Sequence, residues 1–240
     1  MSQLPEAPAP SVPLPAYGWT HRAVTAFARV LARRLFSLEV RGSEHLPANE
    51  ACLLCANHTS HVDTFALATA SGAASRRLIF LGAHDYFSRL RWRRWLLLRM
   101  ICLVEFDRRG TVAAAALNLR SLGACRDDGR IIVLFPEGTR SRDGRMSPFK
   151  PGAAMFAERL AMKIVPCRIE GAHDCLPKGR RFPRPRPLRV TFGPARAVPP
   201  PPAQETGPQR AARYSAFMAD LHRAVAALGA SPAPRPPTQP

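Results

Sequence analysis

The sequence predicts one α/β domain with a mixed, largely parallel sheet flanked by helices. Two observations support this fold class. The chain has 240 residues and 46% of them are hydrophobic, which is enough to bury one substantial core. Between its two ends, short apolar runs alternate with longer stretches of helical pattern, as in sheets whose strands are buried on both faces.

Six apolar runs have the length and composition of buried strands. They are CLLCA (52–56), RLIFLGA (77–83), ICLVEF (101–106), RIIVLF (130–135), KIVPCRI (163–169) and LRVTF (188–192). Helix-like stretches separate most of these runs, at about 64–74, 85–99, 111–126, 151–161 and 209–228. The segment PKGRRFPRPRP (177–187) is too rich in proline for regular structure, so we expect a basic surface loop there.

The two ends of the chain differ in composition from the middle. Residues 1–16 are rich in proline and alanine and residues 230–240 form a similar tail, so we expect both to be disordered. The folded domain should then cover residues 17–229. The N-terminus lacks the pattern of a signal peptide, and no stretch reaches the roughly 20 uninterrupted apolar residues of a membrane span. We therefore expect any membrane association to be peripheral.

Residues 20–36 have the pattern of an amphipathic helix near the N-terminus. Apolar side chains recur there at helical spacing: Val24, Phe27, Leu31 and Leu35. Arginines fall on the opposite face: Arg22, Arg29 and Arg33. Such a helix can lie on a membrane surface, but an ordinary surface helix packed on the core fits the pattern equally well. The segment 86–100 mixes tryptophan with arginine, which suits either lipid headgroups or nucleic acid.

The charge of the chain is strongly unbalanced. Lys and Arg number 35 against 17 Asp and Glu, which gives a net charge of +18 at pH 7. This excess predicts attraction to polyanions, whether nucleic acid, an anionic lipid surface or phosphorylated substrates. Nearly all of the basic residues are arginine, which suits bidentate contacts to phosphate.

The six cysteines are scattered, mostly within apolar runs. Cys52 and Cys55 form the one C-x-x-C pair, without a second pair or a histidine at zinc spacing. We therefore expect buried thiols in a reducing compartment, and neither a metal site nor a cofactor.

The first candidate site, N-H-T-S-H-V-D, covers residues 57–63 directly after a predicted strand. A chain that turns from strand to helix over five residues can bring the carboxylate of Asp63 back to His58. A carboxylate on one imidazole nitrogen fixes the tautomer and leaves the other nitrogen free to act as a general base. The spacing leaves an alternative open, in which Asp63 only caps the next helix and His58 is an ordinary loop histidine.

The second candidate site, F-P-E-G-T-R-S, covers residues 135–141 after another predicted strand. Glycine lets the backbone approach a ligand closely, and Thr, Arg and Ser supply donors suited to a phosphate. The same residues are also common in a solvated β-turn. Lys150, at the start of the next helix, adds a cation near the same strand ends.

Together these motifs resemble the lysophosphatidate acyltransferase family, whose members also acylate glycerol-3-phosphate and other lysolipids. The family is marked by N-H-x4-D, then G-x-x-F-x-x-R, then F-P-E-G-T-R-S, then an apolar strand that holds a proline. Residues 57–63 match the first motif, residues 135–141 match the third throughout, and Pro166 resembles the fourth. Order and spacing agree from about residue 38 to 195.

The second family motif is altered in this chain. Arg108 is present, but Cys102 stands where the family has glycine and Glu105 where it has phenylalanine. The resemblance places this motif beside the acceptor headgroup, so the changes put the identity of the acceptor in doubt.

The resemblance implies a glycerol-3-phosphate acyltransferase-like fold and direct acyl transfer. His58 would deprotonate the acceptor hydroxyl, which attacks the thioester of acyl-CoA or acyl-carrier protein, while Asp63 orients His58. Eight residues are expected to bind substrate: Asn57, Arg108, Glu137, Gly138, Thr139, Arg140, Ser141 and Lys150. Backbone amides near 138–141, or Lys150, are candidates for stabilising the oxyanion.

The expected partners are the acyl donor, a lysolipid acceptor and an anionic membrane surface, with the enzyme peripheral on the cytoplasmic face and no nucleic acid bound. Three alternatives stay open. One is a non-catalytic basic module for nucleic acid or membrane, and a second is a His-Asp hydrolase of acyl thioesters. The third is an acyltransferase for a lyso-aminolipid without phosphate.

Overall fold

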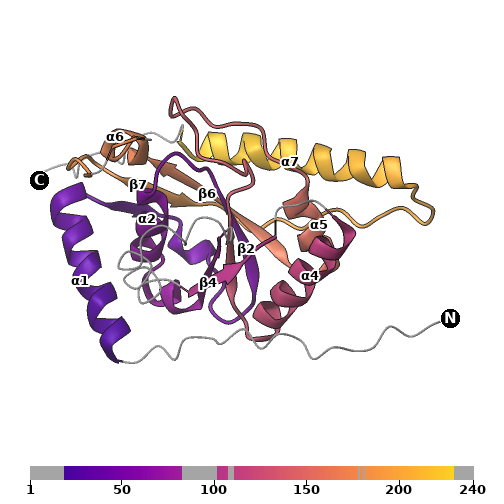
Figure 1. The fold of residues 1–240 in the computed structure, drawn as a ribbon, viewed down its shortest axis with the longest axis horizontal. Coiled ribbons are helices and arrows are strands. Elements are labelled where there is room, and N and C mark those ends of the chain that lie inside the picture. The colour runs from indigo at the N-terminus through magenta and orange to yellow at the C-terminus, as the bar shows by residue number, and fades with distance from the viewer. Residues whose placement is uncertain (1–18, 83–101, 108–110, 178, 181, 230–240) are drawn as a thin grey trace, which may run out of the picture.

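The computed structural model describes residues 19–82, 102–107, 111–177, 179–180 and 182–229. These residues form a seven-stranded sheet in the order β1-β7-β6-β2-β5-β3-β4 (Figure 1). The strands are β1 (Glu39–Arg41), β2 (Cys52–Ala56), β3 (Leu78–Gly82), β4 (Cys102–Glu105), β5 (Ile131–Leu134), β6 (Lys163–Glu170) and β7 (Arg189–Phe192). Neighbouring strands are parallel, except that β6 and β7 are antiparallel. The predicted fold class is confirmed.

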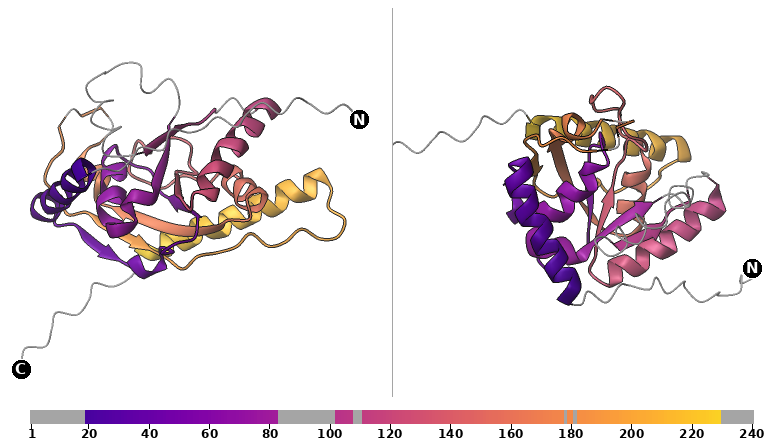
Figure 2. Two further views of the ribbon diagram at one scale, coloured as in Figure 1. Left: turned by 90° about the horizontal axis from the view of Figure 1, so that it is seen from below. Right: turned by 60° about the vertical axis from the view of Figure 1, so that its left-hand side comes forward.

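Helices lie on both faces of this sheet (Figure 2). They are α1 (Trp19–Phe36), α2 (Val62–Ala70), α4 (Val112–Asp127), α5 (Gly152–Arg159), α6 (Ala172–Cys175) and α7 (Gly207–Gly229). Short 3-10 helices at Ser43–His45 and Gly72–Arg77 precede β2 and β3. None of the described helices combines the length and hydropathy that a membrane crossing requires.

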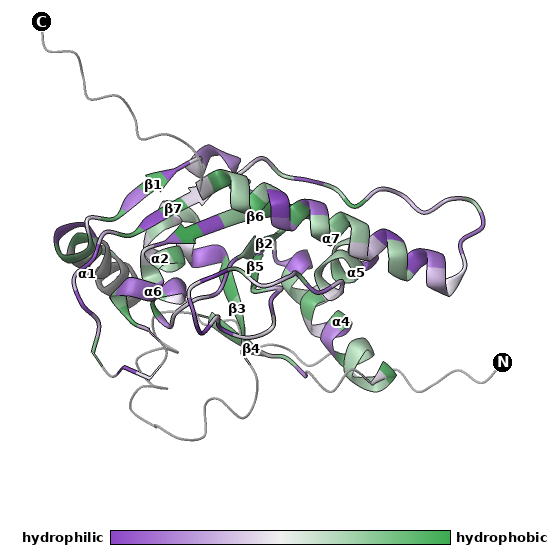
Figure 3. Ribbon diagram, turned by 90° about the horizontal axis from the view of Figure 1, so that it is seen from above, coloured by the Kyte–Doolittle hydropathy of each residue, from purple (hydrophilic) through white to green (hydrophobic). Residues whose placement is uncertain are grey.

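The strands bury alternate side chains against two different layers of helices. Leu53 and Leu54 are neighbours in β2 and both are fully buried, yet they belong to separate hydrophobic clusters. One cluster includes residues of α1, α2 and α6, and the other includes residues of α4, α5 and α7. Because both faces are covered, the central strands β2, β3 and β5 are apolar along their whole length, as the hydropathy colours of β3 show in Figure 3. This is why the sequence identified the strands as continuous apolar runs.

The sequence predictions and the observed elements differ in a few places. All six predicted strands are present, β2 with the predicted bounds and the other five within one residue of theirs. β1 was not predicted because three residues give no recognisable pattern. The predicted helix at 64–74 begins earlier, at Val62, and ends at Ala70 before a 3-10 turn. The predicted helix at 85–99, the Trp- and Arg-rich segment 86–100 and the two ends expected to be disordered, 1–16 and 230–240, all lie outside the described residues.

The amphipathic helix expected at 20–36 is present as α1. Some of its apolar side chains are buried against the domain and others are exposed. Ala32 and Phe36 are buried against the core. In contrast, Phe27 is 68% exposed, and Val30 and Leu35 are exposed with it. The helix therefore packs on the domain and still presents apolar side chains to its surroundings.

The cysteines are buried and free of disulfides, as the sequence predicted. Burial raises the pKa of Cys52 to about 12 and that of Cys125 to about 11. These thiols therefore stay protonated at neutral pH and act as small core side chains.

Candidate active site

Two loops meet at the carboxyl edge of the sheet, one after β2 and one after β5. The two strands are parallel neighbours, with Cys55 opposite Leu134, so their carboxyl ends lie at the same edge. The first loop leads into α2 and contains residues 57–61, and the second contains residues 135–151 and leads into α5. Open α/β sheets present ligand-binding residues at this edge.

Asn57 ties the first loop to the neighbouring strand β6. Its Nδ2 donates to the carbonyl of Ile169 at 2.9 Å, and its Oδ1 accepts from the Ile169 amide at 2.7 Å. The side chain thus makes both bonds that a backbone pair would make, and it extends the sheet just beyond Ala56. Because Asn57 is buried and both ends of its amide are used, it fixes the position of the next residue.

His58 and Asp63 form a direct pair. Nδ1 of His58 lies 2.8 Å from Oδ2 of Asp63. The imidazole is 19% exposed and the carboxylate is fully buried. Within the described part of the chain, Nε2 of His58 has no hydrogen-bond partner. The carboxylate therefore holds one ring nitrogen and leaves the other free toward the surface, as a general base requires.

The local fold of the loop makes Asp63 an acceptor. Asp63 lies in the first turn of α2, and its Oδ2 also accepts from the backbone amides of Thr59 at 2.7 Å and Ser60 at 2.8 Å. The five-residue spacing therefore closes a turn over the carboxylate. The Ser60 hydroxyl donates to the carbonyl of Leu176, which anchors this turn to the segment after α6. The same carboxylate thus orders the loop and orients the imidazole.

The second loop contacts both the backbone and the ring of His58. The His58 amide donates to Oε1 of Glu137 at 2.7 Å, and the His58 carbonyl accepts from the Ser141 amide at 2.9 Å. The imidazole stacks on the ring of Phe135, with centroids 4.0 Å apart and planes 15° apart. Phe135 belongs to the predicted motif, but its stacking role was missed because no sequence signal shows which ring lies above it.

Glu137 is one of the expected substrate ligands, and its carboxylate points inward. It is 3% exposed, and its second oxygen, Oε2, accepts from the Ser147 amide at 2.9 Å. Burial raises the pKa of Glu137, while the backbone bonds from Ser147 and His58 act in the opposite direction. Both carboxylate oxygens accept from backbone amides. The carboxylate therefore links Ser147 of its own loop to His58 of the first loop.

Gly138 and Lys150 are packed against each other. Gly138 has a φ of +76°, and a Cβ atom there would lie 2.7 Å from Nζ of Lys150. The Lys150 amide donates to the carbonyl of Pro136 at 2.9 Å, which brings this lysine back over the turn. Glycine is therefore needed for both the backbone conformation and the passage of the lysine side chain.

Three more predicted residues complete the second loop. Thr139 is exposed and Arg140 is partly exposed. Burial lowers the pKa of Arg140, and attraction between its guanidinium and the Asp63 carboxylate opposes that shift. Ser141, in contrast, is buried and its hydroxyl donates to Asp143 at 2.9 Å. The predicted residues thus divide into an inward set (Asn57, Glu137 and Ser141) and an outward set (Gly138, Thr139, Arg140 and Lys150).

Arg108, the remaining expected ligand, lies outside the described residues. The residue before it is Asp107, whose amide and carbonyl are both bonded by the side chain of Asn118 in α4. Cys102, which replaces the family glycine, is buried among the apolar residues packed on α4 and α5.

The sequence of this loop-and-strand framework matches a known family. The family profile described as Acyltransferase matches residues 37–170, which is more than half of the chain and includes both loops. The chain belongs to the acyltransferase family. The match begins just after α1 and ends with β6, so it covers His58, Asp63 and residues 135–141.

Several curated relatives share one name, 1-acyl-sn-glycerol-3-phosphate acyltransferase. The relative from Limnanthes douglasii is 29% identical over 162 residues, which are 65% of this chain and 53% of that protein. A relative from Chlamydomonas reinhardtii is 29% identical over 69% of this chain and 48% of its own. The human alpha form is 28% identical over 60% of this chain and 50% of its own. The chain spans about half the length of these relatives.

A solved structure shares the fold. The 1-acyl-sn-glycerophosphate acyltransferase PlsC from Thermotoga maritima superposes with a TM-score of 0.61, covering 89% of this chain and 83% of that one. The two sequences are 21% identical. The similarity therefore supports the arrangement of helices and strands given above.

Proposed function

We propose that this domain transfers a fatty acyl group from acyl-CoA or acyl-carrier protein to the hydroxyl of lysophosphatidate or a related lysolipid, as a step of phospholipid synthesis. The observation that carries the proposal is the pair of His58 and Asp63, with Nε2 free, beside the cations of the second loop. The family match and the shared name of the relatives support acyl transfer to such an acceptor.

In the proposed reaction, Nε2 of His58 takes the proton of the acceptor hydroxyl. The alkoxide oxygen attacks the thioester carbonyl, and the bond from carbon to sulfur then breaks. The thiolate leaves and takes the proton back from Nε2, so neither the enzyme nor the balance of protons changes. Asp63 acts through His58: its carboxylate accepts from Nδ1 and stabilises the positive imidazolium between the two steps.

We assign different roles to the two sets of predicted residues. In the outward set, Thr139, Arg140 and Lys150, together with Arg108, would bind the acceptor phosphate by charge-assisted hydrogen bonds. Gly138 would contribute to that site by leaving room for the Lys150 side chain. The inward set of Asn57, Glu137 and Ser141 would hold the backbone of His58 in place. Among the candidates for the oxyanion, the amides of Gly138 and Ser141 already donate to carbonyls. The amides of Thr139 and Arg140, together with Lys150, remain as candidate donors.

The domain is also proposed to act at the surface of an anionic membrane, on its cytoplasmic face and without spanning it. Helix α1 exposes Phe27, Val30 and Leu35, and Arg33 and Arg34 are exposed in its last turn. A helix with exposed apolar and basic side chains can lie at the boundary between headgroups and acyl chains. The net charge of +18 favours an anionic surface.

A panel of acceptors, each offered with acyl-CoA and with acyl-carrier protein, tests this function. Labelled phosphatidate should appear when lysophosphatidate is present, and a lyso-aminolipid offered in its place should remain unacylated. Release of free fatty acid without any acceptor would instead identify a thioester hydrolase. Acylation of the lyso-aminolipid alone would show that the altered residues Cys102 and Glu105 accompany a different acceptor.

A further inference from the structure

The loop at 177–187 forms a basic and aromatic surface that the proposed reaction does not use. Five of its eleven residues are Lys or Arg and none is acidic. The structure describes this loop except at 178 and 181, and there Arg180, Arg184 and Arg186 are exposed. Phe182 is 80% exposed in the middle of these charges. Arginine with an exposed aromatic ring is the composition expected at a lipid headgroup layer.

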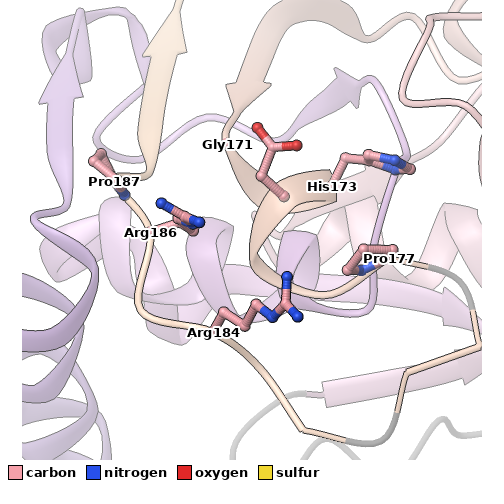
Figure 4. Close-up of a pocket in the computed structure, with 7 residues that line it drawn as sticks. Gly171, His173, Pro177, Arg184, Arg186 and Pro187 are labelled. Atoms are coloured by element: carbon pink, nitrogen blue, oxygen red, sulfur yellow. The ribbon is translucent and has the colours of Figure 1, made fainter.

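A cavity of about 450 Å³ lies between this loop and α6. Figure 4 shows Arg184 and Arg186 on the loop side of the cavity and His173 on the α6 side. Asp174 supplies one carboxylate to the same lining, so two guanidinium groups leave it with a net positive charge. Within the described residues, the buried Nδ1 of His173 has no hydrogen-bond partner. The cavity therefore has the positive charge that a phosphate group would meet.

The arginines are held in place by the backbone of the loop. The Arg184 amide donates to the carbonyl of Cys175 at 2.7 Å, and the Cys175 thiol donates to the carbonyl of Arg184, with 3.0 Å between sulfur and oxygen. Burial raises the pKa of Cys175, so the thiol keeps the proton that it donates. Removal of the arginine side chains would leave both bonds intact.

The loop lies next to α1 and to the active-site loop. Its last residue is followed by Leu188, whose amide donates to the carbonyl of Phe36 at the end of α1 at 2.8 Å. On the other side, the ring of His173 lies against Gly144, where a Cβ atom would come within 3.1 Å of it. Gly144 is three residues after Ser141, whose amide bonds to His58. The cavity thus lies between the membrane helix proposed above and the catalytic loops.

We infer that the loop at 177–187 is a second membrane-binding element, which docks on anionic phospholipid. A headgroup phosphate of the bilayer is held in the cavity by Arg184 and Arg186, and Phe182 inserts among the neighbouring lipids. The inference rests on the proposed membrane association of α1 and extends it to the loop at 177–187. Binding of this loop would bring the proposed active site close to the lipid surface. It does not depend on which acceptor is acylated.

Binding to vesicles tests this inference without using catalysis. The wild type and the double variant Arg184→Ala/Arg186→Ala are sedimented with vesicles of phosphatidylcholine, with and without phosphatidylglycerol. The variant should bind the anionic vesicles about tenfold more weakly, since each surface arginine contributes a few-fold to such binding. Phe182→Ser should weaken binding by about threefold, and on neutral vesicles as well, because it removes an apolar contact.

A matched control removes the same charge elsewhere. Arg120→Ala/Arg159→Ala changes two exposed arginines of α4 and α5, on the other face of the sheet. Its binding should stay within about twofold of the wild type. Equal loss in both double variants would show that only net charge matters, and unchanged binding of the loop variant would equally overturn the inference.

Two activity measurements separate this inference from the proposed function. With a short-chain, monomeric lysophosphatidate, transfer by Arg184→Ala/Arg186→Ala should remain within about twofold of the wild type, because the arginines are not part of the catalytic pair. If the variant binds vesicles normally but needs more acyl-CoA, the cavity binds donor phosphates and not lipid, and the inference is wrong. If neither the wild type nor the variant transfers acyl groups while the vesicle result holds, the proposed function fails and the inference stands.

Discussion

Two buried carboxylates act on the same histidine in different ways. Asp63 accepts from the ring of His58, and Glu137 accepts from its backbone amide. All three hydrogen bonds of Asp63 go to one oxygen, whereas Glu137 uses both of its oxygens. Asp63 therefore orients the ring of the proposed base, and Glu137 fixes the position of its backbone.

The difference predicts that neutral isosteres of the two residues fail in different ways. In Asp63→Asn the amide oxygen can replace Oδ2 and keep all three bonds, with the NH2 group at the position of Oδ1, which has no partner among the described residues. The fold and the imidazole orientation should be kept, but the charge that stabilises the imidazolium is lost. We expect kcat to fall by about a hundredfold to a thousandfold.

The check on Asp63→Asn is a comparison of steady-state rates and thermal unfolding with the wild type. Asp127→Asn, at an exposed position in α4, is the matched control and should leave both unchanged. A rate within threefold of the wild type would break the proposed distinction, since it would show that the charge of Asp63 is unnecessary.

Glu137→Gln should act on stability as much as on rate. Both partners of the carboxylate are N–H donors, so the NH2 group of glutamine would face one of them. The unfolding free energy should fall by about 1–3 kcal/mol, because one buried amide loses its acceptor. The rate should fall by only about tenfold, through displacement of His58. Urea unfolding measures the first effect, and Glu44→Gln at an exposed position is the control.

The outward cations should affect acceptor binding and not the chemical step. For Arg140→Gln we expect KM for lysophosphatidate to rise about tenfold with kcat changed less than threefold, since a charged hydrogen bond to phosphate is lost. Arg142→Gln, an exposed arginine two residues away, provides the control. A large fall in kcat with unchanged KM would show that Arg140 acts on the chemical step and not on acceptor binding.

The smallest predicted effect is a dependence of stability on pH. Burial raises the pKa of Glu137 above its usual 4.5, so the folded protein holds this proton more tightly than the unfolded chain does. The stability that Glu137 contributes is therefore full below pH 4.5 and declines as pH rises through the raised pKa. The difference in unfolding free energy between wild type and Glu137→Gln should decline over the same window, and a difference that grows would contradict the assignment.

The sequence predicted the strands and the contact between His58 and Asp63, but not the direction in which the other proposed site residues point. His58 and Asp63 are five residues apart, so a single turn fixes their contact. In contrast, Asn57 meets Ile169 at 112 positions along the chain, and Glu137 meets His58 at 79. An amide or a carboxylate suits a ligand and a backbone group equally well, and only tertiary packing decides between them. β1 was missed for a related reason: its three residues gain their strand character from pairing with β7.

The role of His58 as the base is tested most directly by the rate at which His58→Ala forms labelled phosphatidate. This variant should fold, because the bonds of residue 58 to Glu137 and Ser141 are made by its backbone and Asp63 keeps two backbone donors. We predict a loss of at least about a thousandfold, with thermal unfolding close to that of the wild type. A folded variant that makes phosphatidate at a near-normal rate would contradict the assignment of His58 as the base.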